Sequence, residues 1–124
     1  MEQYKHKKIL FKLSRALFGL KTSFINEVNF RRHIYIFVLV GLMSYIVQIS
    51  KTEIIFALLC GGLVLTTELI NTAIENICDH VTPEENFNIK KIKDISAGAV
   101  FLSAIFAAII GLIIFVPYLT FLFQ

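Results

Sequence analysis

Residues 95–123 read ISAGAVFLSAIFAAIIGLIIFVPYLTFLF, and no side chain among these twenty-nine residues is charged. A helix that crosses a bilayer needs about 20 apolar residues, so this stretch is long enough to cross one and to tilt. Two further stretches resemble it: Ile34–Ile49 is uncharged, and a run that starts at Ile54 stays uncharged to Thr67 and apolar beyond Glu68. Together they predict membrane-spanning helices over residues 30–49, 54–78 and 95–120.

The chain is short and unusually apolar. Of its 124 residues, 56% are hydrophobic and 17% are charged, so it has more apolar surface than a small water-soluble domain can bury. Strands of a membrane barrel alternate apolar and polar residues, and the three stretches do not. The sequence therefore predicts an all-α integral membrane protein with three transmembrane helices, formed by a single domain over residues 1–124.

Basic residues are distributed unevenly along the chain. Of the 12 lysines and arginines, eight precede the first uncharged run, one lies between the first and second runs, and three lie between the second and third. Loops on the cytoplasmic side of a membrane carry an excess of Lys and Arg. We therefore expect the N-terminus and the second loop in the cytoplasm, and Ser50–Glu53 as a tight turn on the far side together with the C-terminus.

Two segments outside the spans have helical signals of their own. Residues 7–21, KKILFKLSRALFGLK, place their leucines and isoleucine within an arc of about 100° and their basic residues opposite. This pattern predicts an N-terminal amphipathic surface helix in the membrane interface, with an ordinary helix packed on the spans as the alternative. A start signal made by Thr82, Pro83 and Glu85 predicts a separate short cytoplasmic helix over residues 82–92.

Small residues recur every four positions along the third stretch, at Ala99, Ser103, Ala107 and Gly111. Such a stripe lets another helix approach closely. It predicts helix packing and carries no chemistry of its own.

Polar residues gather on one face of the second stretch. With 100° between successive residues of a helix, Glu68, Asn71, Glu75 and Asp79 share an arc of about 80°. Glu68 lies fourteen residues beyond Ile54, or about 21 Å along a helix, which places it in the inner leaflet of the bilayer. Carboxylates inside a membrane are costly and mark a functional site by default.

Further polar residues are expected at the same membrane surface. Glu27 precedes the first span, and Lys93 and Asp94 precede the third. Carboxylates of this kind suit Mg²⁺, which proteins usually hold with one or two carboxylates and substrate phosphates. Two alternatives stay open on the residues alone: a proton or cation relay in a small transporter, and an assembly role for Asn71 and Glu75 as interhelical hydrogen-bonding residues.

The polar pattern also resembles a known family. Glu68-x-x-Asn71-Thr72-Ala73-Ile74-Glu75-x-x-x-Asp79 is similar to the signature of the prokaryotic diacylglycerol kinase family, which includes undecaprenol kinases. The runs 26–31 (NEVNFR) and 93–100 (KDISAGAV) resemble that family too, in its order and at its spacing. The resemblance covers nearly the whole chain. No phosphate-binding G-x-x-x-x-G-K-[ST] loop is present in the sequence, and the family uses none.

The resemblance implies a homotrimer in the bacterial inner membrane that phosphorylates a membrane lipid alcohol with ATP and Mg²⁺, and it implies no nucleic-acid partner. Glu68 would be the catalytic base. Glu27 and Glu75 would hold the metal, and the substrate or nucleotide would contact Asn71, Lys93, Asp94 and Glu75. Because three helices alone are not expected to enclose the Glu68 face, a neighbouring subunit is expected to cover it.

The lipid is left open by the sequence. The runs 29–33 (NFRRH) and 90–95 (KKIKDI) look more like the undecaprenol kinase branch, which favours undecaprenol slightly over diacylglycerol.

Overall fold

The computed structural model describes residues 2–81 and 86–122, and every regular element in them is an α-helix. The four helices are α1 (Glu2–Asn26), α2 (Val28–Val47), α3 (Lys51–Val81) and α4 (Phe87–Leu122). The last three are long and apolar enough to cross a membrane. The prediction of three spanning helices is therefore confirmed, and each of α3 and α4 extends beyond the apolar stretch that predicted it.

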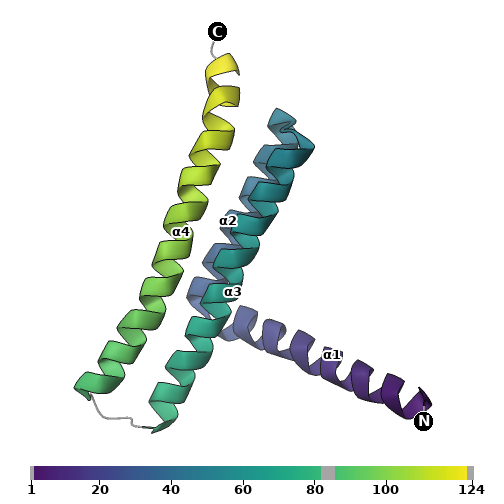
Figure 1. Cartoon of the computed structure of the whole chain (residues 1–124), viewed down its shortest axis with the longest axis vertical. Coiled ribbons are helices and arrows are strands. Elements are labelled where there is room, and N and C mark those ends of the chain that lie inside the picture. Colours follow the sequence, from purple (N-terminus) through teal and green to yellow (C-terminus); the bar gives the residue numbers. More distant parts are fainter. Residues whose placement is uncertain (1, 82–85, 123–124) are drawn as a thin grey trace.

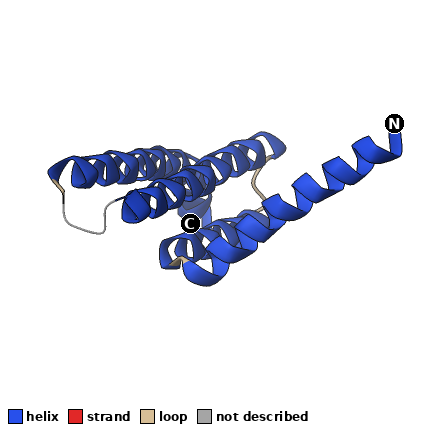
Figure 2. Ribbon diagram, turned by 90° about the horizontal axis from the view of Figure 1, so that it is seen from below, coloured by secondary structure: helices blue, strands red, loops and turns tan. Residues whose placement is uncertain are grey.

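The helices form a thin bundle with one projecting arm (Figure 1). α4 packs along α3, α2 lies against α3, and α1 leaves the bundle at a steep angle in both views (Figures 1 and 2). Few side chains are buried, because only a small part of each helix faces another helix. Six apolar side chains form this small core: Phe30, Ile49, Val64, Cys78, Val100 and Ile114.

The corner between α1 and α2 is held by one arginine and one aromatic pair. Arg31 Nη1 donates hydrogen bonds to the backbone oxygens of Phe24 (3.1 Å) and Ile25 (2.6 Å). The last carbonyls of a helix lack partners within the helix, so Arg31 satisfies two of those that α1 leaves free. The rings of Phe24 and Tyr35 meet edge to face, with centroids 6.5 Å apart.

α1 lies apart from the bundle, so the alternative of a helix packed along the spans does not describe this chain. Along this helix the apolar side chains of Ile9, Leu13 and Leu17 are exposed, and so are the basic side chains of Lys12 and Arg15. The helix is longer than the predicted 7–21 and runs from Glu2 to Asn26. Its position in the membrane interface stays a prediction.

The turn between α2 and α3 lies earlier than predicted. Gln48 adopts the left-handed conformation (φ 56°), and α3 already begins at Lys51. Ser50 Oγ accepts a hydrogen bond from Glu53 N (3.3 Å), and Ser50 N donates one to Glu53 Oε2 (2.7 Å). This reciprocal arrangement is a capping box. The predicted turn over Ser50–Glu53 is therefore wrong, because these residues start a helix.

The second connection also differs from the prediction. The start signal of Thr82, Pro83 and Glu85 lies outside the described residues. Within them, α4 begins at Phe87 and continues without a break through Ile92 into the third span. A separate short helix ending at residue 92 is therefore wrong, and the reason is local: the run KKIK contains good helix formers and no breaker.

The small residues of α4 pack in part against α3. Ser103 is buried, and its hydroxyl lies 3.0 Å from that of Thr67 on α3. Ala99 is exposed, so the stripe is not a contact surface along its full length. On α3, a side chain at Gly61 would collide with the ring of Phe37 from α2.

Candidate active site

The polar residues on one face of α3 form a row along which exposure to solvent increases from Glu68 to Asp79. Glu68 and Asn71 are 4% and 5% exposed, Glu75 is half-buried, and Asp79 is exposed. Asn71 Nδ2 donates a hydrogen bond to Glu75 Oε1 (3.2 Å). The row therefore runs from a buried carboxylate in the apolar part of the helix to a solvent-accessible one near its end. A single chain buries Glu68, so the premise that three helices alone do not enclose this face is wrong, and cover by a neighbouring subunit stays a prediction.

α4 fixes the middle of this row through Ser96. The Ser96 hydroxyl donates a hydrogen bond to Asn71 Oδ1 (2.5 Å) and also contacts the backbone oxygen of Lys93 (3.0 Å). Because its oxygen faces Ser96, the Asn71 amide must turn its nitrogen toward Glu75. Ser96 is itself buried. Sequence reasoning assigned it no role, although it lies in the run 93–100 that carries the family resemblance.

Of the two charged residues that precede the third span, only one reaches the row. Lys93 forms an ion pair with Asp79, which joins the start of α4 to the end of α3. Asp94 is exposed and lines a surface cavity of about 410 Å³ with Lys90 and Lys91 on its own helix. Successive residues of a helix are about 100° apart around its axis, so the adjacent Lys93 and Asp94 cannot both face α3. Within one chain, Asp94 is not part of the candidate site.

Glu27 stands at the first residue before α2, where the chain turns out of α1. Its backbone is extended, and its carboxylate makes no capping hydrogen bond to the helix. Glu27 directly precedes α2, and Glu75 lies in the last two turns of α3. The two residues predicted for the metal therefore come from the start of one helix and the end part of another.

The donor set fits Mg²⁺ as proteins usually bind it with a nucleotide. Among the described residues, no three of His, Cys, Asp and Glu come together to form a metal cage. Mg²⁺ bound by one or two carboxylates and the substrate phosphates needs no such cage. Glu27 has no side-chain capping bond to α2, and within residues 2–81 and 86–122 Glu75 accepts one side-chain hydrogen bond, from Asn71. Both carboxylates therefore retain free acceptor positions.

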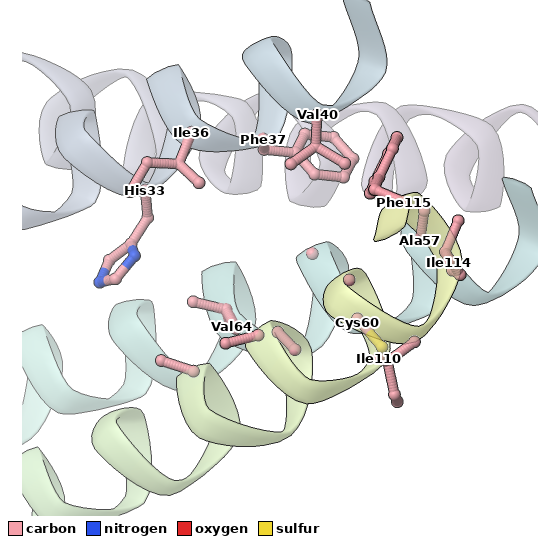
Figure 3. Close-up of a pocket in the computed structure, with 15 residues that line it drawn as sticks. His33, Ile36, Phe37, Val40, Ala57, Cys60, Val64, Ile110, Ile114 and Phe115 are labelled. Atoms are coloured by element: carbon pink, nitrogen blue, oxygen red, sulfur yellow. The ribbon is translucent and has the colours of Figure 1, made fainter. Parts of the chain in front are cut away.

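His33 is a site residue that the sequence gave no reason to select. It comes from α2, and its Nε2 lies 4.0 Å from Glu68 Oε2. It also lines an apolar cavity of about 370 Å³ between α2, α3 and α4, whose walls include Phe37, Val64 and Ile114. In Figure 3 the imidazole extends from α2 at one end of the group of labelled lining residues. No motif spacing links His33 to Glu68, because the two lie on different helices.

The sequence of the chain is similar to those of known proteins. Residues 14–115 match the family described as Prokaryotic diacylglycerol kinase. The chain is 40% identical over 102 residues to an undecaprenol kinase of Bacillus subtilis, covering 82% of each chain. It is 32% identical over 110 residues to a diacylglycerol kinase of Synechocystis, covering 88% of this chain and 63% of that one. A diacylglycerol kinase of Haemophilus influenzae is 28% identical over 95 residues, which cover 77% of this chain and 80% of that one.

The matched region contains the row on α3, the start of α2 and most of α4. The transporter and the pure assembly role, which the residues alone left open, do not describe this family. The chain belongs to the prokaryotic diacylglycerol kinase family and is a phosphotransferase that acts on an alcohol group.

Proposed function

We propose that this protein transfers the γ-phosphoryl group of ATP to the hydroxyl of a membrane lipid alcohol, and that Glu68 is the base of the reaction. The observation that carries the proposal is the graded row on α3. Glu68 is buried beside an apolar cavity, and the row ends at the exposed Asp79. A lipid hydroxyl and a water-soluble nucleotide can therefore approach the same row from opposite ends.

In the proposed reaction, the hydroxyl of the lipid loses its proton to the Glu68 carboxylate, and its oxygen bonds to the γ-phosphorus. The bond from that phosphorus to the ADP oxygen breaks, so the products are a lipid phosphate and ADP. Phosphoryl transfer depends mainly on positioning and on neutralising charge. Asn71, held by Ser96, and Lys93, held by Asp79, are suited to position the phosphates.

Glu27 and Glu75 would hold Mg²⁺ together with the phosphates of ATP. When bound, the ion would neutralise charge on the transferring group. The free acceptor positions of the two carboxylates support this role.

The lipid is undecaprenol or diacylglycerol. The Bacillus subtilis relative, at 40% identity, is named an undecaprenol kinase, and the relatives from Synechocystis and Haemophilus influenzae, at 32% and 28%, are named diacylglycerol kinases. The higher identity favours undecaprenol.

The test is turnover by the purified chain in lipid, given MgATP and either undecaprenol or diacylglycerol. We expect a lipid phosphate from at least one of them, at a higher rate with undecaprenol. No product from either alcohol, combined with proton flux when the protein is placed in liposomes, would contradict the proposal and point to a transporter.

The homotrimer and the orientation in the bacterial inner membrane belong to the same proposal. Asp94 is exposed on α4 within one chain, so a site that uses this carboxylate together with the row would need a second subunit. Crosslinking in lipid should give a three-subunit species. Reporter fusions at Lys51 and at Gln124 should both score as external, since the N-terminus carries most of the basic residues.

A further inference from the structure

The Glu68 carboxylate is the most buried charged group of the site, and its neighbours on α3 are engaged elsewhere. Thr67 Oγ1 contacts Ser103 Oγ of α4 (3.0 Å). The Asn71 amide is divided between Ser96 and Glu75. Neither side chain is turned toward Glu68. A buried carboxylate without a polar partner is costly, so its partner must come from another helix.

The cations at the start of α2 are also engaged. Arg31 donates to two backbone oxygens at the end of α1, and Arg32 donates to Asn29 Oδ1 (3.3 Å). Within residues 2–81 and 86–122, the side chain that pairs with Glu68 is His33, whose Nε2 lies 4.0 Å from Glu68 Oε2. Glu68 thus faces one nitrogen-bearing ring, at the edge of the apolar cavity.

We infer that His33 is the positioning residue of Glu68: its Nε2–H aims the carboxylate at the lipid hydroxyl and stabilises it there. This inference rests on the proposed role of Glu68 as the base. An imidazole with a proton on Nε2 is a hydrogen-bond donor toward a carboxylate. A distance of 4.0 Å is longer than a hydrogen bond, and contacts of this kind commonly shorten when substrate binds. A base that is oriented by a third group follows the general logic of activated catalytic pairs.

The location of His33 explains why this residue type serves here. The His33 side chain is 23% exposed and lines the cavity between α2, α3 and α4, and its Nε2 lies 4.0 Å from the Glu68 carboxylate, whose side chain is 5% exposed. A Lys or Arg would bring a permanent charge to this apolar wall, which is costly in a membrane. Imidazole can donate a hydrogen bond while remaining neutral.

The experiment compares His33→Leu with His33→Gln in the purified protein, using the lipid alcohol that it turns over. Loss of the donor in His33→Leu should lower kcat by about 10–100-fold, the range seen when a group that orients a metal ligand is removed. KM for MgATP should not change. His33→Gln should retain most of the turnover, because its amide nitrogen can donate from nearly the same place.

His80→Leu is the matched control. His80 is exposed on α3, and its Nδ1 lies 2.9 Å from the backbone oxygen of Asn76, away from the row. Its turnover should equal that of the unchanged protein. Wild-type kcat in His33→Leu would overturn the inference, and so would a loss in His33→Gln as large as that in His33→Leu.

A double variant separates this inference from the proposed function. If His33 acts through Glu68, adding His33→Leu to Glu68→Gln should lower the residual turnover no further. A second full loss in the double variant would mean that His33 acts independently of Glu68, and would overturn the inference. If Glu68→Gln alone turns over normally, the proposed base is wrong. If Glu68→Gln collapses and His33→Leu does not, only the role of His33 is wrong.

Discussion

Two glutamates of α3, one in its first turn and one near its middle, face other helices and are used in opposite ways. Glu53 begins the helix. One of its oxygens accepts hydrogen bonds from Ser50 N and from Tyr118 Oη of α4, both at 2.7 Å. Glu68 is buried in the middle of the helix, and its partner His33 stands 4.0 Å away. The half-buried Glu53 carboxylate is held by its neighbours, whereas the buried Glu68 carboxylate retains its acceptor capacity.

The hydrogen bonds of Glu53 therefore join two helices, whereas Glu68 is free to accept a proton. Hydrogen bonds from Ser50 and Tyr118 use the lone pairs of Glu53 and fix the outer ends of α3 and α4 to each other. Glu68 has lone pairs to spare, in surroundings where an unpaired charge is costly. The free-energy cost of burying an ionisable side chain in a membrane marks that side chain as functional.

The largest effect is expected from Glu68→Gln. The amide keeps the shape of the side chain but cannot accept the proton, and a general base contributes about 10²–10⁴-fold. Turnover should fall by that factor, while the affinity for MgATP stays nearly the same. Glu53→Gln is the matched change in the first turn of the same helix and should leave turnover intact. Equal losses in the two variants would remove the distinction between the two glutamates.

Glu75→Gln tests the half-buried carboxylate of the row. Glu75 lies two turns nearer the exposed end of α3, and its free acceptor positions are proposed to hold Mg²⁺. Weaker metal binding should raise KM for MgATP by about 10-fold, with partial recovery at raised Mg²⁺. If Mg²⁺ restores Glu68→Gln and not Glu75→Gln, the two assignments are reversed. If neither change affects turnover, the row is structural.

The smallest effect is expected at the outer end of the bundle. Tyr118→Phe removes the hydroxyl that donates to Glu53 and leaves the ring in place. The midpoint of thermal unfolding in detergent should fall by roughly 2–4 °C, as expected for one hydrogen bond at an accessible site. Turnover should not change. A loss of turnover without a loss of stability would show that the outer end takes part in the reaction.

The helices and the polar face of α3 could be predicted from the sequence, because the signals that indicate them are local. Backbone groups in lipid must be satisfied within the segment, so an apolar stretch such as 95–123 has to be helical. The period of a helix then puts Glu68, Asn71 and Glu75 on one face without reference to the rest of the fold. The sequence-based predictions are wrong at helix ends. Ser50–Glu53 forms a capping box and not a turn, and the run KKIK (90–93) continues α4 and does not end a separate helix.

The tertiary structure alone decided which partners these residues have. The crossing and the relative height of α2, α3 and α4 place Ser96 against Asn71 and His33 opposite Glu68, and within one chain they leave Asp94 exposed on α4. Periodicity within one helix specifies a face, but it does not specify what meets that face. Contacts between helices depend on how side chains of both pack together, and this information is distributed over residues that lie far apart in the sequence.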